Sequence, residues 1–213
     1  MDIFQYPVLS ELAAVMAAKG FSNGHNRLSL KQFVLLDTVA EIFEIVDEIS
    51  QQYLIQSESI EDIYPSSPLQ EGMMALSMLN PKSYILRRVF RLRPTLDVAR
   101  FKCAWELAAE KNPILRTRFV PTPNAGFVQV VVKGSIDWTR AADLEQYLER
   151  DTTEGMVYGA PPVRYGLTED GFFIWTAHHA VYDGWSLPLI LSQVQCAYEH
   201  GHCPDSTPFN TFI

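Results

Sequence analysis

The chain has 213 residues, of which 47% are hydrophobic and 20% are charged, and this balance is typical of a globular protein with a substantial core. Its formal net charge of −8 disfavours binding to the phosphate backbone of a nucleic acid, so no nucleic-acid partner is expected. Its cysteines, Cys103, Cys196 and Cys203, show neither a disulfide framework nor the spacing of zinc ligands, which indicates a reducing compartment.

The N-terminal part of the chain predicts helices and a polar linker. Pro7 stands near the start of a predicted helix over residues 7–18, and the glycine- and serine-rich residues 19–33 indicate a linker. Asp37 can cap a second helix over residues 37–54, whose predicted apolar stripe is Val39, Ile42, Phe43, Val46 and Ile49. The chain shows no signal-peptide pattern at its start and no apolar run as long as a membrane span, so we expect a cytoplasmic protein that does not contact a membrane.

Further along the chain, strand and helix patterns alternate. The Tyr-Pro-Ser-Ser-Pro stretch within residues 60–79 breaks any helix, and a new helix is predicted over 69–79. Apolar patterns predict strands over residues 84–92, 114–120, 127–132, 163–170 and 172–179. Amphipathic patterns predict helices over residues 96–111, 142–151 and 187–201, and the first of these is expected to bury Val98, Phe101, Trp105 and Ala108. This mixture predicts an α/β or α+β layered fold.

Residues 172–179, FFIWTAHH, are apolar on both faces and therefore predict a central, buried strand that ends at two histidines. Because neighbours on a strand point to opposite faces, His178 and His179 cannot easily bind one metal ion, and no metal site is expected. Two interpretations stay open: a structural histidine at a strand end, or a general base with a pKa near neutrality.

The residues that follow favour the second interpretation. Asp183 lies four residues after His179 and can fold back beside the strand end. Gly184 permits the positive φ of a sharp turn, and Ser186 can cap the helix over residues 187–201. A histidine held in this way is suited to act as a general base or proton shuttle.

Three motifs resemble those of one family. HHAVYDGWS, residues 178–186, resembles the HHxxxDG signature of condensation domains of nonribosomal peptide synthetases, whose shorter HxxxD core also occurs in acyltransferases such as chloramphenicol acetyltransferase. IEDIYPSSPLQEGMMALS, residues 60–77, is similar to the opening motif of these domains in fungal synthetases, with Ser66 where a cysteine is common. NPILRTRF, residues 112–119, resembles their second motif, with Asn112 where histidine is usual.

The resemblance implies a domain organisation. Residues 60–213 are expected to form an α/β lobe, an α+β sandwich like chloramphenicol acetyltransferase, and to be the N-terminal lobe of a condensation domain. Residues 1–20 are similar to the last helices of a carrier (thiolation) domain, and residues 21–59 to a linker with one helix. The chain is therefore expected to be a fragment that lacks the second lobe and is inactive by itself.

The resemblance also implies roles for individual residues. The complete domain would form an amide bond between two carrier-bound acyl groups, with His179 acting as a general base or as a group that positions the attacking amine. Gly184 N–H or a protonated His179 would stabilise the developing oxyanion. The candidate catalytic set also contains His178 and Asp183, although a structural role is favoured for His178. Asp183 is expected to form a structural salt bridge with Arg116 of the second motif.

No cofactor is expected to bind directly, because the substrates would arrive on the 4′-phosphopantetheine of carrier domains. The implied partners are an upstream and a downstream carrier domain, the C-terminal lobe and an adjacent adenylation domain. Gln70 and Gly72 of the opening motif are expected to shape the fold near the reaction tunnel. Two alternatives stay open: an epimerization domain, which shares the HHxxxDG pattern, and a docking or scaffolding piece without catalysis.

Overall fold

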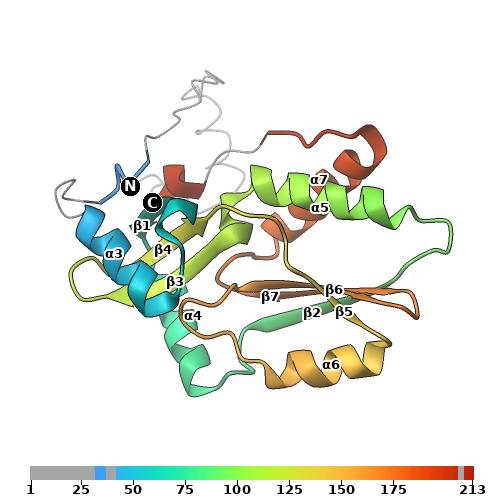
Figure 1. Ribbon diagram of the computed structural model, residues 1–213, viewed down its shortest axis with the longest axis horizontal. Coiled ribbons are helices and arrows are strands. Elements are labelled where there is room, and N and C mark those ends of the chain that lie inside the picture. The colour runs from blue at the N-terminus through green and yellow to red at the C-terminus, as the bar shows by residue number, and fades with distance from the viewer. Residues whose placement is uncertain (1–31, 37–41, 206–208) are drawn as a thin grey trace, which may run out of the picture.

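The computed structural model describes residues 32–36, 42–205 and 209–213. The predicted helix over residues 7–18 and almost all of the predicted glycine-rich linker lie outside the described residues. The described part of the chain holds a three-stranded sheet and a four-stranded sheet with helices packed around them (Figure 1).

The three-stranded sheet has the order β1-β4-β3 and is antiparallel throughout. Its strands are β1 (Ile60–Pro65), β3 (Thr117–Thr122) and β4 (Gly126–Val132). Strand β1 was not predicted, and β3 begins later than predicted, because Pro113–Arg116 forms a 3-10 helix, η3. Proline suits the first position of such a helix, since its fixed φ is already helical and its missing N–H would have no partner there.

Helix α3 (Ile42–Tyr53) packs against this sheet and confirms the greater part of the helix predicted over residues 37–54. Its buried side chains are Ile45 and Ile49, whereas Phe43 is 85% exposed. The predicted stripe was therefore wrong at Phe43, because a spacing of three to four residues selects Ile42, Ile45 and Ile49 as one face.

The four-stranded sheet has the order β2-β7-β6-β5, in which only the β5–β6 pair is parallel. Its strands are β2 (Ile85–Arg91), β5 (Trp138–Ala141), β6 (Val163–Thr168) and β7 (Phe172–His178). Strand β7 pairs with β2 on one side and β6 on the other, which confirms the prediction of a central, buried strand. Strand β5 was not predicted.

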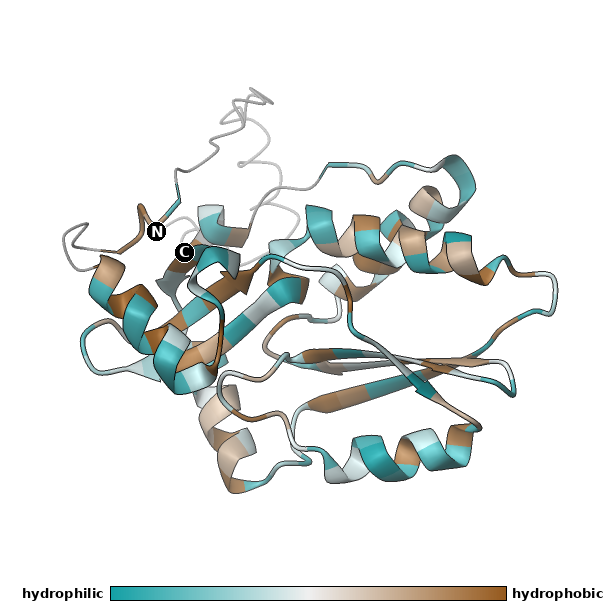
Figure 2. Ribbon diagram, in the orientation of Figure 1, coloured by the Kyte–Doolittle hydropathy of each residue, from teal (hydrophilic) through white to brown (hydrophobic). Residues whose placement is uncertain are grey.

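Helices cover both faces of the four-stranded sheet (Figure 1). Helices α5 (Val98–Lys111) and α7 (Ser186–His200) lie on one face, where Trp105 packs among Phe173 and Trp175 of β7. Figure 2 shows hydrophobic and hydrophilic residues alternating along these helices and hydrophobic stretches in the strands of the sheet. The prediction that Val98 is buried was wrong: it is 45% exposed, because it lies in the first turn just after the capping residue Asp97.

Helix α6 (Leu144–Thr153) covers the opposite face of the same sheet. Its Tyr147 ring packs so closely on β6 that a Cβ added at Gly166 would lie 2.2 Å from the ring. Glycine is therefore required at this position by close packing. None of the helices in the described ranges is both long and apolar enough to cross a membrane.

Helix α4 (Pro68–Leu79) begins with a reciprocal capping box and connects the two sheets along the chain. Gln70 N–H donates to the Ser67 hydroxyl at 3.3 Å, while Ser67 N–H donates to Gln70 Oε1 at 2.9 Å. Pro68 occupies the first turn of α4. The Tyr-Pro-Ser-Ser-Pro stretch therefore contains both the end of β1 and the start of α4.

Candidate functional site

The two histidines at the end of β7 point to opposite faces of the sheet, as predicted. The His178 side chain is fully buried, whereas His179 is exposed. Both backbones are fixed, because His178 N–H donates to Pro162 O and His179 N–H donates to Tyr84 O, each at 2.8 Å. The strand end therefore presents one imidazole to the interior and one to the outside.

The His178 ring is bonded on both sides. Its Nδ1 accepts from Ala180 N–H at 3.0 Å, so its proton resides on Nε2, which lies 2.7 Å from the Ser77 hydroxyl of α4. Burial, and to a smaller extent the adjacent His179, lower the pKa of His178 to about 4. A neutral, buried and fully bonded ring has the geometry of a structural histidine.

The His179 ring stacks on Tyr182, with centroids 4.8 Å apart and an interplanar angle of 22°. Burial raises the pKa of the Tyr182 hydroxyl, and the positive charge of Arg88 opposes this increase. The sequence predicts that Tyr182 and Trp185 are packing groups. Tyr182 is half-buried against His179, but Trp185 is 80% exposed and is not a packing group within the described chain.

Asp183 holds the loop that leads into α7. Its Oδ1 accepts from the N–H groups of Trp185 at 3.0 Å and Ser186 at 2.7 Å, and these bonds lower the pKa of its carboxyl. In return, Asp183 N–H donates to the Ser186 hydroxyl at 2.8 Å. The expectation that Ser186 caps the helix is thus corrected: Ser186 is the first helical residue, and Asp183 supplies the oxygen that the free N–H groups need.

The predicted salt bridge between Arg116 and Asp183 is wrong. The Arg116 guanidinium pairs with Glu61 Oε2 at 2.8 Å and also donates to the carbonyls of Ala109 at 2.9 Å and Val132 at 3.0 Å. Arg116 lies in η3 against the end of β4, whereas Asp183 lies in an exposed loop before α7 and uses its carboxylate on backbone N–H groups.

Gly184 also differs from its expected role. Among the described residues, left-handed φ values occur at other glycines, namely Gly126, Gly134, Gly159, Gly171 and Gly201. A Cβ added at Gly184 would meet no atom within 4 Å. The turn therefore does not need glycine for its backbone conformation, and the predicted positive φ was wrong.

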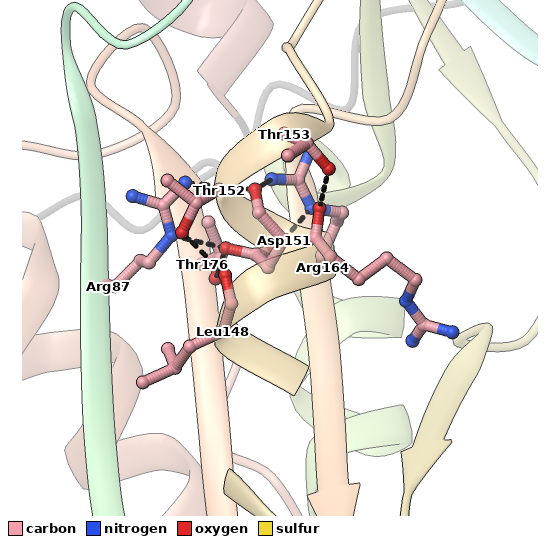
Figure 3. A network of polar contacts seen from close by, with 8 residues as sticks. Arg87, Leu148, Asp151, Thr152, Thr153, Arg164 and Thr176 are labelled. Carbon is pink, nitrogen blue, oxygen red and sulfur yellow. Dashed lines mark hydrogen bonds and ion pairs between the residues drawn. The ribbon is translucent and has the colours of Figure 1, made fainter. Parts of the chain in front are cut away.

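A buried charge cluster, for which the sequence gives no signal, lies on the His178 side of the sheet (Figure 3). Asp151 of α6 is 2% exposed and pairs with Arg87 of β2 and, at 2.7 Å, with Arg164 of β6. Thr176 of β7 donates to the same carboxylate at 3.1 Å. Burial by itself would raise the pKa of Asp151, but the arginines outweigh it and the pKa is lowered. In YILRRVFRLRP, residues 84–94, arginines alternate with apolar residues, which predicts the solvent-facing side of a strand; Arg87 is instead partly buried and pairs with Asp151.

Gln70 links the opening motif to the loop after β7. It is 4% exposed, and its Nε2 donates to Ala180 O at 3.0 Å and to Gln129 Oε1 at 3.1 Å. Gly72 is exposed on α4, and a Cβ there would meet nothing within 4 Å. Within the described ranges, no group of three or more His, Cys, Asp or Glu side chains is placed to hold a metal ion.

Comparison with known proteins agrees with this geometry. The sequence profile of the Condensation domain family matches residues 60–213, and the chain belongs to this family. Nonribosomal peptide synthetase atnA of Emericella nidulans is 40% identical over 200 residues, which is 93% of this chain. Nonribosomal peptide synthetase gloA of Glarea lozoyensis is 40% identical over 230 residues and matches all of the chain. The chain spans 3% of each of these synthetases.

Solved structures show the same fold. A protein described as CT has a TM-score of 0.67 at 18% identity, with 85% of this chain and 44% of that chain covered. The starter condensation domain of rhizomide synthetase RzmA has a TM-score of 0.57 at 18% identity, with 71% of this chain and 42% of that chain covered. The predicted fold class, a mixed α/β lobe like chloramphenicol acetyltransferase, is confirmed.

Proposed function

We propose that this chain supplies the reactive histidine of a condensation domain that forms an amide bond between two carrier-bound acyl groups. The observation that carries the proposal is the environment of His179. Its ring is exposed at the end of the central strand, its backbone is fixed on Tyr84 O, and it lies within residues 60–213, which match the family.

In the proposed reaction, the amine of the acceptor attacks the thioester carbonyl of the donor. The C–N bond forms, the C–S bond breaks, and the donor's pantetheine leaves as a thiol. The His179 imidazole takes the proton that the amine loses and returns it to the departing sulfur, so charge and protons balance. General acid–base catalysis of this kind contributes about 10²–10⁴-fold. Holding the amine in line is an alternative contribution of the same ring.

Other residues of the loop have distinct roles in this proposal. Among the described residues, no acceptor engages Gly184 N–H, so this group is open to the oxyanion of the tetrahedral intermediate. Asp183 holds the loop through backbone N–H groups, and His178 supports the strand end from inside. We assign neither Asp183 nor His178 to direct contact with substrate.

The substrates and partners belong to the same proposal. The relatives are nonribosomal peptide synthetases, which supports delivery of both substrates on 4′-phosphopantetheine by carrier domains. The remainder of the condensation domain and an adjacent adenylation domain are the further partners. Residues 1–20 are proposed to be the end of a carrier domain, and residues 21–59 the linker that follows it.

The test uses a synthetase module that contains this chain together with the rest of the condensation domain and two loaded carrier domains. Mass spectrometry is expected to detect the condensed product only when both carriers are loaded. His179→Ala should abolish it while the melting temperature is unchanged. Incubation in D₂O separates the alternatives, because an epimerization domain would exchange the Cα hydrogen of a single bound residue without forming an amide. A module that carries out neither reaction would contradict the proposal and favour a scaffolding role.

A further inference from the structure

Helix α4 places two buried polar side chains under the strand end that carries His179. Gln70 and Ser77 are seven residues apart, which is close to two helical turns, so they lie on the same face of the helix. They are 4% and 1% exposed, while the residues between them on the outer side of the helix are exposed. Buried polar groups are costly unless bonded, so the partners of this pair determine what the helix face does.

Ser77 holds the residue before His179. Its hydroxyl lies 2.7 Å from His178 Nε2 and also donates towards the carbonyls of Met73 at 3.0 Å or Ser83 at 3.2 Å. Because His178 Nδ1 accepts from Ala180 N–H, the ring links Ser77 of α4 to the backbone of the loop. The Ser77 hydroxyl therefore holds the rotamer of His178, while Ala180 N–H fixes its tautomer.

Gln70 holds the residue after His179. One hydrogen of its amide is used on Ala180 O and the other on Gln129 Oε1, while its Oε1 accepts from Ser67 N–H. The side chain of Gln129 is fixed in turn, because its Nε2 donates to Pro65 O at 3.1 Å. The bonds to Ser67 N–H and Ala180 O fix the Gln70 amide at both ends without Gln129, and the bond to Ala180 O holds the loop against α4.

His179 lies between these two fixed points and touches neither side chain. Within the described part of the chain, no hydrogen bond reaches its ring, which rests against Tyr182. The position of the imidazole is consequently set by the backbone of His178, His179 and Ala180. We propose that Gln70 and Ser77, the α4 clamp, are positioning residues that set the place of the His179 ring for amide formation. This inference rests on the proposed function.

The test compares clamp variants with a matched control in the same complete module. Gln70→Met and Ser77→Ala each remove one bond to the residues that flank His179. Gln129→Met removes an equally buried amide from the same network but leaves the bond between Gln70 and Ala180 in place. A misplacement of about 1 Å can cost about 10²-fold in rate, so kcat is expected to fall about 10- to 100-fold in both clamp variants.

The control and the kinetic constants distinguish positioning from general destabilisation. KM for each loaded carrier should stay within about twofold in the clamp variants, since the substrates are not contacted. Gln129→Met should lower the melting temperature as much as Gln70→Met does, yet keep the kcat of the wild type. Folded clamp variants with the kcat of the wild type, or an equal loss of kcat in Gln129→Met, would overturn the proposal.

Hydrogen exchange on the wild-type protein gives an independent test that needs no variant. The amides of His179 and Ala180 should exchange as slowly as those in the centre of β7, and rapid exchange would contradict a clamp.

Failure of the proposed function can be distinguished from failure of the clamp. In that case the wild-type module forms no amide or His179→Ala remains fully active, whereas a failed clamp leaves the wild type active and His179 essential.

Discussion

At the end of β7, polar side chains are buried and paired on one face of the sheet and exposed on the other. On the His178 side, Asp151 is buried and is bonded to Arg87 and Arg164, which are partly buried. On the His179 side, the imidazole and the Asp183 loop are exposed. Charge on the first side stabilises the fold, whereas the second side is accessible to another molecule. The adjacent residues His178 and His179 thus lie in a buried and an exposed environment, and the proposed chemistry belongs to the exposed one.

Asp151→Asn should produce the largest loss of stability. It removes the buried carboxylate that pairs with the partly buried Arg87 and Arg164, and breaking such a cluster costs about 3–5 kcal/mol in the free energy of unfolding. Urea denaturation measures this loss. Asp183→Asn is the control, because asparagine caps a helix about as well as aspartate and the position is exposed, so the loss there should be less than about 1 kcal/mol. Equal losses for the two aspartates would remove the difference between the two sides.

The pH dependence of stability should report the burial of His178. Its pKa is about 4 in the folded chain and near 6.5 in an unfolded one, so the unfolded chain binds more protons between these values. The free energy of unfolding should therefore fall by about 3 kcal/mol as the pH is lowered from about 6.5 to about 4. His178→Gln should lose this dependence, whereas His179→Gln should keep it. The lowered pKa of Asp151 acts in a separate window, because its stabilisation is lost only below the pKa of an unfolded aspartate, about 4.

Gly166→Ala tests the packing beneath the charge cluster. The added Cβ would lie 2.2 Å from the Tyr147 ring, so α6 must shift, and such overpacking costs about 1–3 kcal/mol. Gly184→Ala on the His179 side meets no atom within 4 Å and should leave the melting temperature unchanged. A large loss at Gly184 would show that the loop is more constrained than its geometry indicates.

Features that depend on a local sequence pattern, such as a single strand or helix, were predicted from the sequence. The apolar run FFIWTAHH indicated a strand at the centre of a sheet, and β7 confirms it. The strand period of two correctly assigned His178 and His179 to opposite faces. The helix predicted over residues 69–79 was confirmed, since the capping box and Pro68 mark its start within a few residues.

Pairings between distant residues were not predictable in the same way. Arg116 was assigned to Asp183, but its acidic partner is Glu61, which is 55 residues away in sequence. Asp151 is one of 25 acidic residues, and nothing in its neighbourhood shows that Arg87, 64 residues away, folds against it. Strand β5 has four residues, too few for an alternation to be recognised.

The most direct test of the account compares His178→Ala with His179→Ala in the complete module, measuring the free energy of unfolding and the rate of amide formation for both. His178→Ala should be destabilised by about 2 kcal/mol or more, because it opens a cavity and leaves Ser77 and Ala180 N–H without their partner. His179→Ala should change stability by less than about 0.5 kcal/mol, as expected for an exposed residue, while the rate falls by about 10²-fold or more. A His179→Ala module that keeps the wild-type rate, or that unfolds as readily as His178→Ala, would contradict the separation of stability and chemistry across β7.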